Sequence, residues 1–92
     1  MTYENIPEAF QTKLRVAITA TLYNGEKDFN TLKELLNVTD GNLSVQLSKL
    51  EQFGYLLSEK VTGKRQTIYR ITDYGRMMFK EYVELLTQSI GE

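Results

Sequence analysis

Apolar residues in the first quarter of the chain recur at the spacing of an α-helix. Between about Pro7 and Tyr23 they form a single helical stripe, made of Phe10, Leu14, Ala17, Ile18 and Leu22. A proline is tolerated in the first turn of a helix, and the pair Asn24-Gly25 can adopt the left-handed conformation that closes one. We therefore predict one helix over residues 7–23, followed by a short connection with room for a brief strand near Asp28-Phe29.

The next segment has the pattern of two shorter helices joined by a tight turn. Asn30 is a good N-cap for a helix that ends near Asn37, and the residues expected to be buried there are Leu32, Leu35 and Leu36. Residues 38–41 predict the turn, in which Thr39 or Asp40 caps a third helix that runs to about Phe53. Leucines at i, i+4 and i+7 mark the inward face of this helix, namely Leu43, Leu47 and Leu50.

After Gly54 the pattern changes from helical to strand-like. Residues 55–61 and 66–72 are rich in Tyr, Leu, Ile, Val and Thr, and Gly63 between them suits a turn. Thr72 can cap a last helix from Asp73 to about Ser89. The sequence thus predicts a mainly α fold with a small β-hairpin, in the order α-α-α-β-β-α, as a single domain over residues 1–92.

Composition limits the chemistry of this domain. The 92 residues include no cysteine and no histidine, which removes thiolate chemistry, the commonest general base and the commonest metal ligand. There is no glycine-rich phosphate loop, and Glu81 with Glu84 has the spacing of a solvated pair on an exposed helix. We therefore expect no enzyme activity, no metal and no cofactor. We also expect a cytoplasmic protein, because no segment resembles a signal peptide or a membrane span.

The charge is nearly neutral overall but unevenly distributed. The net charge is −1, yet residues 41–76 carry six basic and three acidic residues. Residues 1–40 carry four basic and six acidic residues, and residues 77–92 carry one basic and three acidic residues. The asymmetry is modest, but it concentrates positive charge in the third helix and the hairpin. This charge would attract a polyanion.

The order of the elements predicts how the chain binds DNA. Two short helices joined by a tight turn and followed by a hairpin with a basic tip form the winged helix-turn-helix plan. In this plan a helix over about residues 40–53 enters the major groove, and a wing over residues 61–67 meets the backbone or the minor groove. The predicted DNA contacts are Thr39, Gly41, Asn42, Ser44, Val45, Ser48, Lys49, Lys60, Lys64 and Arg65. Gln46 lies nearer the core side and is a weaker candidate.

Two blocks of the sequence resemble a known family. Residues 28–55, DFNTLKELLNVTDGNLSVQLSKLEQFGY, and residues 67–76, TIYRITDYGR, are similar to winged-helix transcriptional regulators of the MarR/ArsR-like superfamily, above all to compact stand-alone winged-helix domains. The resemblance covers nearly the whole chain and implies sequence-specific binding of double-stranded DNA by a homodimer. This sequence departs from the family at Val45 and Gln46, where a basic residue or a histidine is common.

The last helix carries more apolar residues than one small core needs. They form two neighbouring stripes, Tyr74, Met78, Tyr82 and Leu85 in one and Phe79, Val83, Leu86 and Ile90 in the other. We expect part of this surface to pack on the first helix and the rest to contact a second copy, which makes residues 73–90 a dimerisation helix. The predicted interface residues are Phe10, Leu14, Met78, Tyr82, Leu85 and Leu86.

One other function remains open at this point. A winged helix alone does not establish DNA binding, and the near-neutral charge is compatible with a protein-protein interaction module. The DNA-binding hypothesis requires the basic residues on one continuous face, namely Lys49, Lys60, Lys64 and Arg65. A small-molecule effector at the dimer seam is also compatible with the sequence, although no cluster of polar residues marks a pocket.

Overall fold

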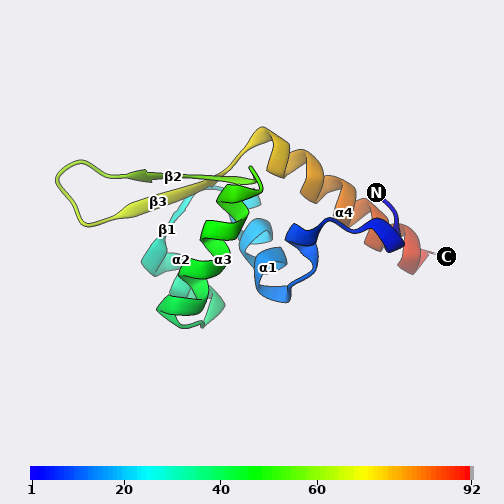
Figure 1. The fold of residues 1–92 in the computed structure, drawn as a ribbon, viewed down its shortest axis with the longest axis horizontal. Helices are drawn as coiled ribbons and strands as arrows, with labels where there is room; N and C mark the ends of the chain where they lie inside the picture. Colours follow the sequence, from blue (N-terminus) through cyan, green and yellow to red (C-terminus); the bar gives the residue numbers. More distant parts are fainter. Residues whose placement is uncertain (92) are drawn as a thin grey trace.

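The computed structural model describes the backbone of residues 1–91 and the side chains of residues 1–88. Its regular elements are α1 (Lys13–Tyr23), β1 (Lys27–Asp28), α2 (Phe29–Leu36), α3 (Asp40–Gln52), β2 (Leu56–Lys60), β3 (Thr67–Ile71) and α4 (Asp73–Gly91), preceded by two short 3-10 turns at Tyr3–Asn5 and Glu8–Phe10. The molecule is elongated, 50 × 25 × 21 Å, with the hairpin at one end, α4 at the other and the remaining helices between them (Figure 1). The predicted element order and fold class are confirmed.

The strands form a small antiparallel sheet in the order β1-β3-β2. The hairpin register runs from the pair Leu56 and Ile71 to the pair Lys60 and Thr67. The brief strand expected near residues 28–29 is β1, which pairs with β3 through Lys27 and Tyr69. The sheet therefore ties the start of α2 to the hairpin. In the described part of the chain, no helix is long and apolar enough to cross a membrane.

The core lies where α1, α2 and α3 meet the sheet. Its most deeply buried side chains come from the predicted helical stripes and include Ile18, Leu22, Leu32, Leu43, Leu47 and Leu50. The expected burial of Leu35 is wrong, because Leu35 is 60% exposed. Because α2 is only eight residues long, it presents one narrow stripe to the core, and Leu32 with the half-buried Leu36 already fills it.

The helix predicted over residues 7–23 is interrupted. A 3-10 turn ends at Phe10, and α1 begins at Lys13 after Thr12, whose φ of −127° and ψ of 131° are extended. The break directs the Phe10 ring into an aromatic cluster, with its centroid 5.3 Å from that of Tyr55 and 4.9 Å from that of Tyr82. Apolar spacing alone did not reveal the break, because Phe10 keeps a helical interval from Leu14 whether or not the helix is continuous.

The cap of α2 also differs from the expectation. Asp28, rather than Asn30, is the N-cap, and its Oδ1 accepts a hydrogen bond of 2.7 Å from the Thr31 backbone N–H. This bond holds the pKa of Asp28 below its ordinary value. The other carboxylate oxygen accepts a 2.8 Å bond from Gln66, the last residue before β3. One side chain thus caps α2 and secures the hairpin, a pairing that local sequence cannot reveal.

The start of α4 lies against the end of α3 and the start of β2. The Thr72 backbone N–H donates to the Tyr55 carbonyl at 2.9 Å, and the Thr72 hydroxyl accepts from the Gly75 N–H at 2.9 Å, as its predicted cap role requires. Gly75 is buried. A Cβ on Gly75 would clash with the Tyr55 carbonyl oxygen, so only glycine allows the helix this close to the chain.

The close approach at Gly75 predicts a loss of stability on substitution. Gly75→Ala is expected to lower the free energy of unfolding by about 1–3 kcal/mol, because the methyl group meets backbone that cannot move aside easily. The melting temperature should fall by roughly 5–20 °C. Gly41→Ala is the matched control, since no heavy atom lies within 4 Å of a Cβ there. Equal melting temperatures for the two variants would contradict this account of the α4 junction.

The burial of Tyr55 predicts a dependence on alkaline pH. Burial raises the pKa of its phenol from 10.0 to about 12, and Tyr74 and Glu81 add to the rise. Because the folded pKa exceeds the unfolded one, the contribution of this group to stability is complete below pH 10 and is lost as the pH rises toward 12. Urea unfolding at stepped pH should show a smaller alkaline loss for Tyr55→Phe. Tyr3→Phe, at a tyrosine 79% exposed, should behave as wild type.

Candidate nucleic-acid interface

The turn between α2 and α3 is held by one backbone conformation and two side-chain interactions. Asn37 takes the left-handed conformation at φ 51° and ψ 54°, which ends α2. Thr39 caps α3 as predicted, its hydroxyl accepting from the Asn42 N–H at 3.3 Å. Lys33 of α2 forms an ion pair of 2.8 Å with Asp40 at the start of α3. The two helices are therefore fixed as a helix-turn-helix unit.

The two faces of α3 differ sharply. Leu43, Leu47 and Leu50 are at most 1% exposed and hold the helix on the core. All the residues predicted to contact DNA from this part of the chain are exposed, namely Thr39, Gly41, Asn42, Ser44, Val45, Ser48 and Lys49. They are small or hydrogen-bonding side chains, with Val45, 51% exposed, as the apolar exception. The outer face of α3 is thus free of bulky groups that would hinder entry into a groove.

The wing brings three predicted basic residues together at its tip. Gly63, at φ 78°, allows the tight turn, which is closed by the Val61 N–H bonding the Gln66 carbonyl at 2.9 Å. A shallow hollow of about 340 Å³ is lined by Lys60, Lys64, Arg65, Gln66 and Thr67. None of these three cations forms an ion pair within the described residues, whereas Arg70, nearer the core, pairs with Glu59 at 2.8 Å. Lys49 does not line this hollow, since it comes from α3.

A buried arginine connects α3 to the N-terminal segment. Arg15 is 5% exposed, and its Nη1 donates to the Gln46 side-chain oxygen at 2.7 Å. Its Nε donates to the Ala9 carbonyl at 3.0 Å and its Nη2 to the Glu8 carbonyl at 2.8 Å. This contact is not evident from the sequence pattern. Its helical spacing does indicate that Arg15 is buried, because Arg15 lies three residues before Ile18 and seven before Leu22, on the buried stripe of α1.

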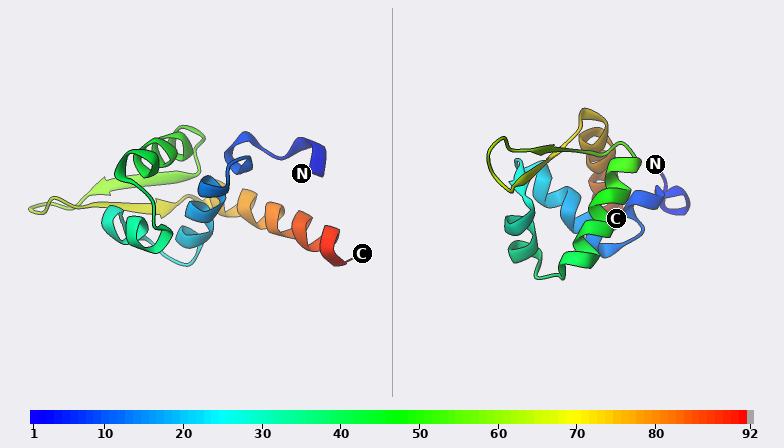
Figure 2. Two further views of the ribbon diagram at one scale, coloured as in Figure 1. Left: turned by 90° about the horizontal axis from the view of Figure 1, so that it is seen from below. Right: turned by 60° about the vertical axis from the view of Figure 1, so that its left-hand side comes forward.

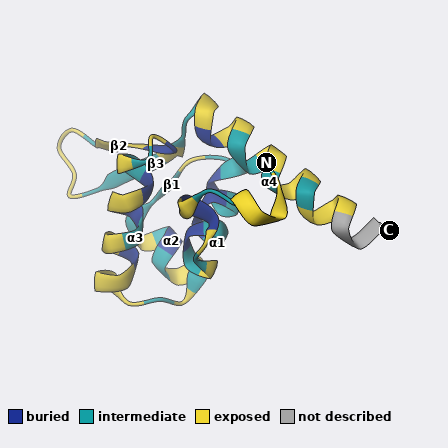
Figure 3. Cartoon of the chain, turned by 45° about the vertical axis from the view of Figure 1, so that its right-hand side comes forward, coloured by how far each residue is buried: buried dark blue, intermediate teal, exposed yellow. Residues whose placement is uncertain are grey.

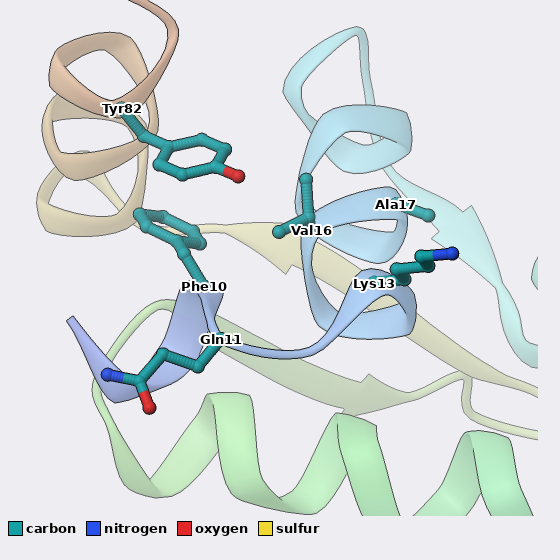
Figure 4. Close-up of a pocket in the computed structure, with 6 residues that line it drawn as sticks. All are labelled: Phe10, Gln11, Lys13, Val16, Ala17 and Tyr82. Atoms are coloured by element: carbon teal, nitrogen blue, oxygen red, sulfur yellow. The ribbon is translucent and has the colours of Figure 1, made fainter. Parts of the chain in front are cut away.

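An open groove separates the start of α1 from α4. It has a volume of about 320 Å³ and is lined by Phe10, Gln11, Lys13, Val16, Ala17 and Tyr82. Figure 4 shows the rings of Phe10 and Tyr82 packed against each other, with Val16 beside them. Phe10 itself is 4% exposed, so it forms the floor of the groove. The groove is mainly apolar, with Lys13 and Gln11 at its polar side.

The second half of α4 extends beyond the body of the molecule (Figure 3). The N-terminal segment lies beside it (Figure 2). Met1 lines a shallow pocket together with Glu81, Glu84 and Leu85. Of the residues predicted to form a dimer interface, Leu14, Met78, Tyr82 and Leu85 are half-buried, and Leu86 is 43% exposed. Val83 is 42% exposed. The side chain of Ile90, which completes the second predicted stripe, lies outside the described residues.

The chain matches one family model and is similar to archaeal proteins. Residues 14–90 match the model of a family described as winged helix DNA-binding domain. The chain is 45% identical over 82 residues to an uncharacterized protein from Methanocaldococcus jannaschii, in a match that covers 86% of this chain and 89% of that protein. The structure of a transcriptional regulator homologue from Pyrococcus horikoshii superposes with a TM-score of 0.80 at 26% identity, over 91% of each chain.

Larger proteins share the fold. ZitR from Lactococcus lactis superposes with a TM-score of 0.78 at 16% identity, over 91% of this chain and 58% of ZitR. This chain therefore spans less than two thirds of ZitR, and at that identity the likeness concerns the fold alone. The structural neighbours include MarR-family transcriptional regulators.

Proposed function

The chain belongs to the family of winged helix DNA-binding domains, and from this premise we propose that it regulates transcription by binding specific sequences of double-stranded DNA as a homodimer. The observation that carries the proposal is the outer face of α3. It is exposed, rich in small hydrogen-bonding side chains, and backed by leucines that fix its position. Such a surface fits the major groove, where base edges present donors and acceptors.

In this proposal α3 reads the bases from the major groove. Asn42 and Ser44 lie in its first turns, the part of a recognition helix that lies nearest the base edges. Val45 is positioned to contact the methyl group of thymine. Ser48 and Lys49 are positioned to contact bases or phosphates further along the groove. Thr39 and Gly41, at the helix start, are suited to the phosphate backbone, since the N–H groups there attract anions.

The wing supplies contacts that do not depend on sequence. Lys60, Lys64 and Arg65 surround one hollow and have no acidic partner among the described residues. Their charge is therefore available for phosphates beside the groove that α3 occupies. The wing extends from the body at the end opposite to α4 (Figure 1), which suits a second contact on the same duplex.

We further propose that α4, over residues 73–90, is the dimerisation helix and works with the start of α1. The groove between these helices is open and mainly apolar, and Val83 and Leu86 expose apolar surface on the part of α4 beyond the body. Leu14, Met78, Tyr82 and Leu85 border this surface, while Phe10 supports it from within. A two-fold dimer would present two copies of α3 to successive turns of DNA, roughly 34–36 Å apart.

DNA binding predicts a strong dependence on salt. The wild-type chain should retard duplex fragments, and its log affinity should fall linearly with log salt. Lys64→Ala combined with Arg65→Ala should weaken binding to all duplexes alike and reduce the slope by about 2 per protomer, as two phosphate contacts are lost. Arg70→Ala is the matched control, because Arg70 is already paired with Glu59. Absence of binding to any duplex at low salt would favour a protein-protein interaction module.

Substitutions on α3 are expected to act differently from those on the wing. Asn42→Ala and Ser44→Ala should change which sequences are preferred, by about 1–3 kcal/mol at the base pairs they contact. Selection of bound duplexes from a random library measures the preference for each variant. A uniform loss of affinity without a change of preferred sequence would show that these side chains contact only phosphate.

The dimer proposal predicts that a charge on α4 separates the protomers. Leu86→Lys should convert the dimer to monomers in sedimentation velocity and weaken DNA binding, because an unpaired ammonium would be buried at the interface. Leu35→Lys is the control, since Leu35 is an exposed leucine on α2, away from α4. A wild-type chain that sediments as a monomer at micromolar concentration would contradict the proposal.

A further inference from the structure

The orientation of one side chain on α3 has consequences for sequence preference. We propose that Gln46 reads DNA as a hydrogen-bond donor only, because its amide oxygen already accepts a hydrogen bond from Arg15. It would then distinguish keto groups, which accept hydrogen bonds, from amino groups, which donate them. This inference rests on the proposed entry of α3 into the major groove and adds a specificity-determining residue to that site.

The amide orientation of Gln46 is dictated by its partner. A guanidinium has donors and no acceptor, so the side-chain atom 2.7 Å from Arg15 Nη1 must be the amide oxygen. The arginine itself cannot turn away, because its other nitrogens donate to the Ala9 and Glu8 carbonyls at 3.0 and 2.8 Å. The Gln46 amide is therefore anchored by a group that is itself anchored and buried.

The amide nitrogen of Gln46 is left available. It donates to no group among the described residues, and the side chain is only partly buried. Within the same residues, Glu51 has the only buried side-chain polar atom that lacks a partner, so the Gln46 nitrogen reaches solvent. Its hydrogens are also made better donors, because the positive charge of Arg15 draws electron density through the amide oxygen.

The position of Gln46 places it beside residues proposed to contact DNA. It follows Asn42 by four residues and precedes Lys49 by three, so the three side chains lie along one edge of α3. Asn42 and Lys49 are both exposed. Gln46 thus stands between them, at the border between the outer face of the helix and the N-terminal segment.

A donor-only glutamine reads bases differently from a free one. A free glutamine can bind adenine with both amide atoms, accepting from N6 and donating to N7. Here the oxygen faces Arg15 and cannot turn to the base. Where it faces the exocyclic group of a base rather than a purine N7, the remaining donor favours guanine O6 or thymine O4 and disfavours the amino groups of cytosine and adenine. We therefore expect a keto preference of up to about tenfold at one position of each half-site.

The test exchanges the donor for an acceptor without removing the partner of Arg15. Gln46→Glu keeps an oxygen for the guanidinium and replaces the free NH2 group with a second oxygen. The wild type and variant are titrated against duplexes that carry each of the four base pairs at every position of the selected site. We expect one position per half-site to change from keto preference to preference for cytosine or adenine, while the other positions stay the same. Gln46→Met should abolish the preference there without reversing it.

A matched control separates base reading from added charge. Gln52→Glu makes the same change of charge at an exposed position of α3, and it should lower affinity equally for all duplexes. If Gln46→Glu behaves in the same way, with no position-specific change, Gln46 does not read bases and the inference is overturned, while the proposed DNA binding stands. If the wild-type chain binds no duplex, both the proposed function and this inference fall.

Discussion

The buried guanidinium of Arg15 is the constraint on which much of this structure depends. A charge that is 5% exposed must have its donors satisfied, since each unpaired buried polar group costs about 1–3 kcal/mol. The described residues supply no carboxylate for it, and the Glu8 and Ala9 carbonyls take that place. In a continuous helix those carbonyls would bond the backbone N–H groups four residues later. Among the described residues, the break before Lys13 leaves the Ala9 carbonyl to Arg15 alone, while the Glu8 carbonyl accepts both from Arg15 and from the Gln11 N–H at 3.1 Å. The interruption of the helix thus provides the acceptors that the buried charge needs.

The same guanidinium contacts both the segment behind the proposed dimer surface and the helix proposed to bind DNA. Through Glu8 and Ala9 it holds the turn that carries Phe10, which forms the floor of the groove between α1 and α4. Through Gln46 it contacts α3. The proposed dimer surface and the proposed DNA-reading surface therefore share one rigid link, and the leucines of α3 keep the helix from shifting on the core. A two-fold dimer built on this link would hold its two recognition helices at a defined separation.

The sequence predicted those parts of the fold that local periodicity determines. The burial of Leu43 and its partners and the cap at Thr39 follow from spacing and side-chain chemistry within a few residues, and the structure confirms them. The family resemblance is confirmed as well. What the sequence could not predict depends on distant partners. Asp28, the cap of α2, is also held by a hydrogen bond from Gln66, which lies 38 positions away in the sequence. Gln46 is oriented by Arg15, which lies 31 positions away. The individual DNA and dimer contacts remain predictions.

The near-neutral net charge does not oppose DNA binding once the positions of the charges are considered. Two acidic residues close to the proposed interface are already paired, Asp40 with Lys33 and Glu59 with Arg70. The cations at the wing tip lack such partners in the described structure, so positive potential is concentrated where the duplex would lie. Electrostatic attraction from three side chains per protomer is nevertheless modest. Affinity would then depend on doubling the contacts in a dimer, and specificity on hydrogen bonds from a helix whose side chains are held in place. A fixed amide such as that of Gln46 is more useful in this design than another flexible charge, because little conformational entropy is lost when it meets its base.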